Sequence, residues 1–186
     1  MSPSASIRTF VALELCRELR EALAELVAAL QPRVPRARWV RPEGIHLTLR
    51  FLGPSSPEQI NDLRAALSAA ALVCGPSEAR VAGLASFPDR RRPRVLWLGV
   101  TLPGPILELQ AACEAAAVAT GFPPEARSFR PHLTLARFRE RAPLPDLPSP
   151  DLGPTLLETL VLFRSDTGPG GASYTALHRV ALGGAE

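Results

Sequence analysis

Two hydrophobic periodicities run through the 186-residue chain. Apolar residues that recur every three to four positions predict amphipathic helices, whereas alternating or short continuous apolar runs predict strands. The helical pattern predicts a helix over 17–31, a second opening at Ser56 and a third from Pro105 to Gly121. The strand pattern occurs at 8–15, 45–52, 79–87, 94–101, 131–138, 156–165 and 172–182.

Local signals mark the ends of these elements. Pro32 ends the first helix, because proline cannot continue the hydrogen-bond ladder, and Gly121 ends the third. The second begins with a capping box, Ser-Pro-Glu-Gln at 56–59, with proline at the first helical position. The proline-rich stretch at 141–154 predicts an irregular loop.

The tetrad His-Leu-Thr-Leu occurs twice, at 46–49 and at 132–135. Each copy lies on a predicted strand that follows a predicted helix. We therefore expect an α+β fold with two pseudo-symmetric αβ lobes in one bilobal domain spanning 1–186. Each lobe should be a mainly antiparallel sheet with helices on its outer face, and the lobes should enclose a central cleft.

All 21 basic residues are arginine, and the formal net charge is +3. Without lysine, neither a lysine nucleophile nor a P-loop lysine is available. Arginines cluster at 33–41, 89–94 and 127–141, and two clusters adjoin or contain a tetrad. One cluster alone could be a solvated basic face, but beside both tetrads an anionic ligand is favoured, because guanidinium groups grip phosphate bidentately.

The three cysteines, Cys16, Cys74 and Cys113, are widely spaced and odd in number. This spacing favours buried free thiols over a disulfide or a zinc site. The chain shows neither a secretory signal pattern at its N-terminus nor an apolar run of the ~18 residues that a membrane span needs. A cytoplasmic protein without a membrane partner is the expectation.

On a strand, alternate side chains share a face, so His46 and Thr48 should point one way and their leucines the other. His132 and Thr134 repeat the arrangement. Imidazole gives or takes a proton near neutral pH, and two facing imidazoles can act as base and acid in one reaction. With two hydroxyls to bind oxyanions, the set suits attack on a phosphodiester.

Other chemistries fit less well. One His-x-Thr alone is more often a structural histidine than a catalytic one. A dihistidine metal site is disfavoured because neither tetrad carries a carboxylate or a second histidine at ligand spacing. A serine hydrolase would need a Gly-x-Ser-x-Gly turn, which is absent. The remaining histidine, His178, lacks the threonine two positions on, and we expect a structural or surface role for it.

The paired tetrads and their flanking motifs, in this order along the chain, resemble the 2H phosphoesterase superfamily. Within it the chain resembles the RNA 2′,3′-cyclic phosphodiesterases, also called 2′-5′ RNA ligases, over about residues 7–182. The motifs are Arg-Thr-Phe-Val-Ala-Leu (8–13), the Trp-to-Gly stretch 39–53, Pro-Arg-Val-Leu-Trp-Leu-Gly-Val (93–100), the stretch 129–137, and Gly-x-x-Tyr-Thr-Ala-Leu (171–177).

The resemblance implies hydrolysis of a 2′,3′-cyclic phosphate end to a 2′-phosphomonoester, without metal or other cofactor. His46 would be the proton donor, His132 the acceptor, and Thr48 and Thr134 would bind phosphate oxygens. The reverse reaction would join ends through a 2′-5′ bond. The implied partners are RNA ends with a cyclic phosphate, such as tRNA fragments, or small cyclic nucleotides, and the protein would act as a monomer.

Further substrate-binding candidates flank the tetrads. Alternation places Arg130 on the face of His132 and Arg137 on the other face unless the strand bulges, but the family's Leu-Ala-Arg ending keeps both as phosphate ligands. Phe51 is expected on the face of His46 and Thr48, where it could stack on a base, although a core position is the alternative. Trp39 is an equally loose stacking candidate.

Two other functions remain open from sequence. The chain could be an arginine-rich RNA-binding module without catalysis, which would bind RNA in a salt-dependent way without needing either histidine. It could also be a cyclic phosphodiesterase of small nucleotides, which would prefer mononucleotide over oligonucleotide substrates.

Overall fold

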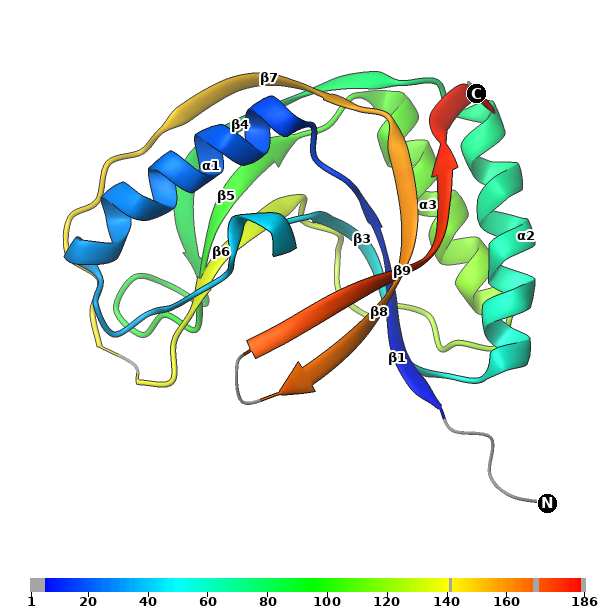
Figure 1. Ribbon diagram of the computed structural model, residues 1–186, viewed down its shortest axis with the longest axis horizontal. Coiled ribbons are helices and arrows are strands. Elements are labelled where there is room, and N and C mark those ends of the chain that lie inside the picture. The colour runs from blue at the N-terminus through cyan, green and yellow to red at the C-terminus, as the bar shows by residue number, and fades with distance from the viewer. Residues whose placement is uncertain (1–5, 141, 169–170, 185–186) are drawn as a thin grey trace.

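The computed structural model describes residues 6–140, 142–168 and 171–184 (Figure 1). Residues 1–5, on which part of the signal-peptide expectation rests, and Arg141, in the third arginine cluster and the predicted proline-rich loop, lie outside it. The α-helices are α1 (Arg17–Leu30), α2 (Pro57–Val73) and α3 (Gly104–Ala119). The strands are β1 (Ile7–Leu13), β2 (Arg38–Trp39), β3 (Leu47–Ser55), β4 (Ser77–Phe87), β5 (Val95–Thr101), β6 (His132–Arg137), β7 (Asp151–Leu157), β8 (Thr159–Gly168) and β9 (Gly171–Ala181).

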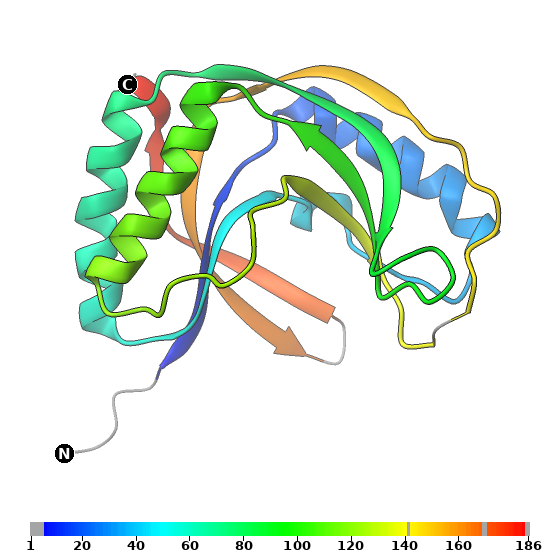
Figure 2. The same ribbon diagram turned by 180° about the vertical axis from the view of Figure 1, so that it is seen from behind.

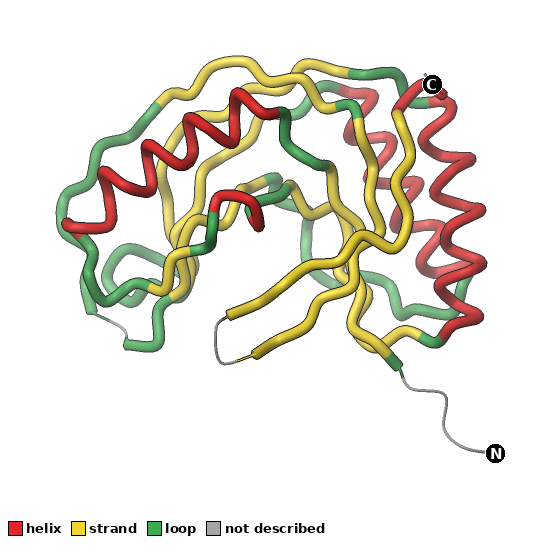
Figure 3. The backbone as a smooth tube through the Cα atoms, viewed as in Figure 1, coloured by secondary structure: helices red, strands yellow, loops and turns green. Residues whose placement is uncertain are grey.

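The strands form one curled antiparallel sheet in the order β7-β4-β5-β6-β3-β1-β8-β9, with β2 beside β6 (Figures 1 and 3). The order divides evenly between β6 and β3. We call β1, β3, β8 and β9 the first lobe, because it carries the first tetrad, and β4 to β7 the second lobe. The expected α+β fold with two lobes is confirmed. The strands of the two lobes form one sheet and are joined where the tetrad strands β6 and β3 meet.

The helices lie on the outside of the sheet and are unevenly shared (Figures 1 and 2). Helices α2 and α3 pack together against the first lobe, whereas α1 lies over the second lobe and contacts β7. Thus α1 follows β1 but covers the other lobe, and α3 follows β5 but packs against β3. This exchange ties the lobes together through one continuous hydrophobic core.

The predicted helix signals act as expected. The Ser56 hydroxyl accepts a hydrogen bond from the Gln59 amide, and the Gln59 side chain accepts one from the Ser56 amide, which confirms the capping box. Helix α1 ends at Leu30, and Pro32 lies in the 3₁₀ turn that follows. Beyond α3, Gly121 adopts a φ of +88°, a left-handed conformation that favours glycine.

The prediction of one strand over 156–165 is wrong, because the chain changes lobes at Glu158. Strand β7 pairs with β4 in the second lobe, and β8 pairs with β1 in the first. The predicted loop at 141–154 also ends too late, since β7 begins at Asp151. Pro154 is tolerated there because β7 is an edge strand, where a missing N–H leaves no ladder bond unmade.

The cysteines are free, as predicted. Cys74 and Cys113 are buried, while Cys16 is half-buried near the Thr155 hydroxyl. Burial raises the pKa of the Cys113 thiol to about 12, which makes it unreactive. Within the described ranges, no helix is long and apolar enough to cross a membrane.

Candidate active site

The two tetrads meet at the centre of the sheet. Leu47 of β3 pairs with Leu133 of β6 in antiparallel register, and both leucines are fully buried. Continuing this register one residue each way places His46 beside Thr134 and Thr48 beside His132. All four polar side chains therefore share the face opposite the leucines, which anchor them to the core.

This register sets the two imidazoles diagonally across the strand pair. In a regular antiparallel ladder, diagonal neighbours have Cβ atoms about 7–8 Å apart, close enough for two side chains to approach one small group from opposite sides. His46 and His132 are also near enough to influence each other electrostatically. The threonines occupy the other diagonal, so each histidine has a hydroxyl across from it.

Both imidazoles are held in the same way by the chain just before them. His46 Nδ1 lies 2.8 Å from the Gly44 carbonyl oxygen, and His132 Nδ1 lies 2.7 Å from the Arg130 carbonyl oxygen. A carbonyl can only accept, so each Nδ1 carries the proton and donates it. Nε2 is then the atom of each ring that is left to exchange a proton with a ligand.

His46 sits in an aromatic cage formed by three strands of the first lobe. Its ring stacks on Phe10, with centroids 4.6 Å apart and planes inclined by 27°. Tyr174 meets it edge-on at 5.0 Å, and Phe163 lies 5.9 Å away. The cage removes most water from one side of the imidazole and fixes the plane of the ring.

Burial in this cage lowers the pKa of His46 to about 4. The Gly44 carbonyl opposes the shift, whereas the charges of Arg137 and His132 add to it. In the free protein at neutral pH, His46 is therefore neutral. Burial also raises the pKa of Tyr174, which stays a neutral phenol.

His132 has a more open aromatic wall, built from the second lobe. Phe87 meets its ring edge-on at 5.3 Å, and Trp97 approaches at 5.9 Å and 66°. Phe87 and Trp97 stack on each other at 4.7 Å. Among the described residues, no ring stacks face to face on His132.

Both tetrad strands bulge at the second leucine. In β3, Thr48 pairs with Ala12 and Phe51 with Phe10, so one extra residue is inserted. In β6, Thr134 pairs with Trp97 and Arg137 with Val95, again with one extra residue. A bulge shifts the alternation by one position. Phe51 and Arg137 thereby occupy matching places on the site face.

The bulges determine the face of the sheet on which two candidate ligands, Phe51 and Arg137, lie. Strict alternation would put Arg137 on the core face. It would put Phe51 there too, so the ground for expecting Phe51 on the face of His46 and Thr48 was wrong, and only the bulge brings Phe51 to that face. Phe51 is 54% exposed and lies near Phe10, with ring centroids 6.0 Å apart. Arg137 is exposed and close enough to His46 and Tyr174 to affect the pKa of both. The core alternative for Phe51 is therefore wrong, and Arg137 lies on the site face.

Arg130 and Trp39 are placed differently. Arg130 is exposed and precedes β6; its carbonyl orients His132, and its side chain makes no hydrogen bond or ion pair among the described residues. Trp39 pairs with Ala136, a buried residue, and packs against the core. Its half-buried position against the core disfavours stacking on a base, and this suggestion stays a prediction.

Sequence reasoning missed the aromatic cage of Phe10, Phe163 and Tyr174. The three residues lie on β1, β8 and β9, and only the strand order brings them together. Two had a usable signal, since Phe10 and Tyr174 belong to the flanking motifs 8–13 and 171–177. The structure also separates His178 from the site: its Nε2 lies 2.8 Å from the Ser68 hydroxyl, which links β9 to α2.

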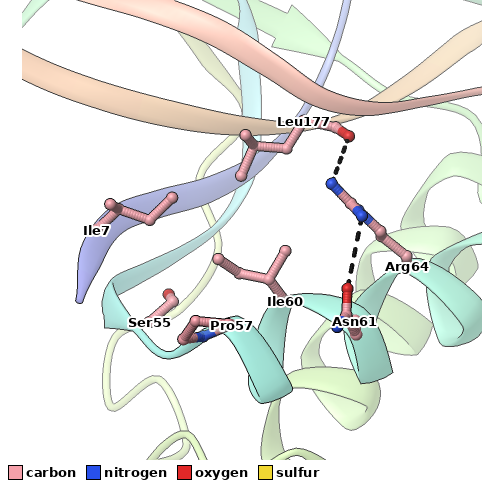
Figure 4. Close-up of a pocket in the computed structure, with 7 residues that line it drawn as sticks. All are labelled: Ile7, Ser55, Pro57, Ile60, Asn61, Arg64 and Leu177. Carbon is pink, nitrogen blue, oxygen red and sulfur yellow. Dashed lines mark hydrogen bonds between the residues drawn. The ribbon is translucent and has the colours of Figure 1, made fainter. Parts of the chain in front are cut away.

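A hollow of about 340 Å³ lies away from the tetrads, between β1, α2 and β9 (Figure 4). Apolar Ile7, Ile60 and Leu177 line it, and the Arg64 guanidinium there donates to the Leu177 carbonyl. Its lining includes neither a histidine nor a carboxylate, in contrast to the face that carries His46 and His132. In the part of the chain that the structure describes, no cluster of three or more His, Cys, Asp or Glu could hold a metal ion.

The sequence matches the family of LigT like phosphoesterases over residues 13–97 and 100–171. A curated RNA 2′,3′-cyclic phosphodiesterase of Methanothermobacter thermautotrophicus is 30% identical over 176 residues, 91% of this chain and 95% of that protein. One from Geobacillus stearothermophilus is 34% identical over 128 residues, 69% of this chain but only 41% of the longer relative. A crystal structure of a protein from Thermus thermophilus superposes with a TM-score of 0.84 at 33% identity, covering 97% of this chain and 100% of the other.

Proposed function

Because the chain belongs to the LigT like phosphoesterase family, we propose that it hydrolyses 2′,3′-cyclic phosphate ends of RNA to 2′-phosphomonoesters. The curated relatives described above carry the name RNA 2′,3′-cyclic phosphodiesterase. The observation that carries the proposal is the register of β3 on β6. It brings two histidines and two threonines, each pair on one diagonal, to one face of the sheet, which supports the binding of one phosphate among them.

The residues fit an acid–base mechanism. His132 Nε2 takes a proton from water, whose oxygen attacks phosphorus while the bond from phosphorus to O3′ breaks. His46 Nε2–H gives its proton to O3′, which leaves as a hydroxyl, and phosphate remains on O2′. The Thr48 and Thr134 hydroxyls donate to the non-bridging oxygens. Each general acid or base contributes about 10²–10⁴-fold.

The donor role of His46 depends on the substrate. In the free protein its pKa is about 4, too low to hold a proton at neutral pH. A bound phosphate brings a negative charge next to the imidazole, offsets the charge of Arg137 and offers an acceptor for Nε2–H. All three effects raise the pKa of His46. His46 thus gains its proton together with the anion on which it acts.

Arg137 is the arginine best placed for that phosphate, because the bulge in β6 turns it onto the face of His132 and Thr134.

The joining of two RNA ends through a 2′-5′ bond would use the same acid and base with a different nucleophile. If an RNA 5′-hydroxyl replaces water, His132 takes its proton, and attack on the cyclic phosphate gives a 2′-5′ bond. Hydrolysis should dominate where water is in excess.

The test is an incubation in EDTA of a short RNA ending in a 2′,3′-cyclic phosphate with the protein, with His46→Gln and with His132→Gln. The expected product is a 2′-phosphate, with the rate lowered about 10²–10⁴-fold in each variant. A matched control is His178→Gln, which removes a histidine outside the site. RNA binding without turnover by the unaltered protein would favour a binding module, and activity only with added divalent metal would overturn the mechanism.

A further inference from the structure

A second arginine stands directly beside Arg137. Strand β2 lies along the same edge of β6 as β3, and its Arg38 is the cross-strand partner of Arg137. The Val40 amide donates to the Leu135 carbonyl at 2.8 Å, which extends the pairing towards the tetrads. Directly opposed residues of an antiparallel pair share a face, so Arg38 projects on the side of Arg137 and the active site.

Among the described residues, no carboxylate compensates the charge of this pair. Neither Arg38 nor Arg137 makes an ion pair with a carboxylate among the described residues, and both are exposed. Like charges opposite each other across a strand pair destabilise a sheet. Nearby Arg36, in contrast, is paired with Glu140 at 3.0 Å. An uncompensated pair at the edge of an active site is an arrangement suited to an anion from outside the chain.

The order of the side chains along this edge of β6 indicates which anion would bind to the two arginines. Three cross-strand rows follow one another: Thr48 with His132, His46 with Thr134, and then Arg38 with Arg137. Under the proposed function, His46 protonates the O3′ that leaves, so the ribose of the terminal nucleotide lies on the His46 side. The chain that continues from the 5′ carbon of that ribose then leaves past the arginine row.

We propose that Arg38 binds the phosphate on the 5′ side of the terminal nucleotide and thereby makes the site selective for oligonucleotide ends over nucleosides with a bare 5′-hydroxyl. The inference rests on the proposed function and adds a second phosphate position to it. Arg137 faces the reacting phosphate, while Arg38, one strand farther out, meets the next phosphate of the RNA chain.

The test compares two substrates that differ in one group: adenosine 2′,3′-cyclic phosphate and the same compound carrying a 5′-phosphate. In the unaltered protein we expect a higher kcat/KM for the 5′-phosphorylated substrate. Arg38→Ala should lower kcat/KM about tenfold on that substrate, the size of one hydrogen bond to a charged group, and change it less than twofold on the other. Arg38→Lys should retain part of the difference, because it keeps the charge.

Two further arms complete the experiment. Arg36→Ala removes a neighbouring exposed arginine that is already ion-paired, and it should affect the two substrates equally. On a short RNA ending in a cyclic phosphate, Arg38→Ala should reduce the slope of log affinity against log salt by about 0.7, the value for one phosphate of a single strand.

The results distinguish a failure of the proposed function from a failure of the proposed role of Arg38. If the unaltered protein cleaves neither nucleotide and no cyclic-phosphate RNA, the proposed function fails. If it cleaves them but Arg38→Ala slows both nucleotides equally, Arg38 acts at the reacting phosphate and the inference is overturned. The inference is also overturned if Arg38→Ala matches the unaltered protein on both.

Discussion

The two tetrads are identical in sequence but stand in different surroundings. His46 is stacked on Phe10 and enclosed by Tyr174, whereas His132 is touched only by ring edges among the described residues. Both rings donate Nδ1–H to the carbonyl two residues before them. The tetrad therefore sets the face of each histidine, and the carbonyl two residues earlier sets its tautomer. At His46, residues far away in the chain also lower the pKa by burying the ring.

The bulges show a second difference between the lobes. After the matching bulge, β3 places Arg50 on the core side and β6 places Ala136 there. Arg50 is only 6% exposed, contacts the Glu114 carboxylate and donates to the Phe51 carbonyl at 2.6 Å and to the Pro123 carbonyl. The first tetrad is thus anchored by a buried charge network to α3 and to the segment before the second tetrad, where Ala136 needs only apolar packing.

The largest expected effect breaks this anchor. Arg50→Ala should lower the free energy of unfolding by about 3–5 kcal/mol, because it leaves the Glu114 carboxylate without its partner in a partly buried place. Urea denaturation measures the change. Arg36→Ala, which removes an exposed ion pair, should cost no more than about 1 kcal/mol. Equal losses in the two variants would show that the buried network does not anchor β3.

The next largest effect is the pH dependence of stability that His46 causes. Its pKa is about 4 in the folded protein against 6.5 ordinarily, so the unfolded chain binds the proton more readily between these values. Stability should therefore fall as pH drops from about 6.5 towards 4, by up to about 3 kcal/mol for this group. Above pH 6.5 its contribution should be constant.

Thermal unfolding of the unaltered protein and of His46→Gln, from pH 4.5 to 7.5, isolates this contribution. The variant should lose less stability on acidification. The pKa of His178 is also lowered by burial, but it contributes equally to both proteins and cancels in the difference. Parallel curves for the two proteins would mean that the cage does not depress the pKa of His46.

A smaller effect is expected when either lobe loses the threonine hydroxyl that binds the phosphate. Thr48→Val and Thr134→Val each remove one hydroxyl from equivalent places, so each should lower kcat/KM about tenfold, with similar values for the two. Steady-state kinetics on a cyclic-phosphate substrate measure both. A loss confined to one variant would show that only one lobe binds the phosphate oxygens and that the repeat is unequal in this respect.

The smallest effect concerns Phe51, which stands where the second lobe has Arg137. Phe51→Ala should weaken RNA binding by about 1 kcal/mol through lost base stacking and change stability by less than about 0.5 kcal/mol, because the ring is exposed. Fluorescence anisotropy with a short RNA measures the first. Val73→Ala, at a residue 88% exposed on α2, is the control. Unchanged affinity in Phe51→Ala would remove Phe51 from the binding surface.

Much of this fold follows from local patterns in the sequence. Periodicity and caps predict the three α-helices to within a few residues at the ends they mark, and the repeat predicts the two lobes and the meeting of the two tetrad strands. Bulges depend on which residue of a distant strand lies opposite, so alternation alone misplaces Arg137. The cage around His46 and the change of lobe at Glu158 could not be predicted for a related reason. Both depend on the order of the strands in the sheet, and a short stretch of sequence does not specify that order.

We infer that the cage of Phe10, Phe163 and Tyr174 keeps His46 neutral until a phosphate binds beside it. An NMR titration of the His46 imidazole, in the free protein and with adenosine 2′-monophosphate bound, tests this directly, with His46→Gln identifying the resonance. We expect a pKa of about 4 for His46 in the free protein and a clear rise towards neutrality in the complex. A pKa that stays near 4 with phosphate bound would contradict it, because His46 could then not donate the proton and the two histidines would have to exchange roles.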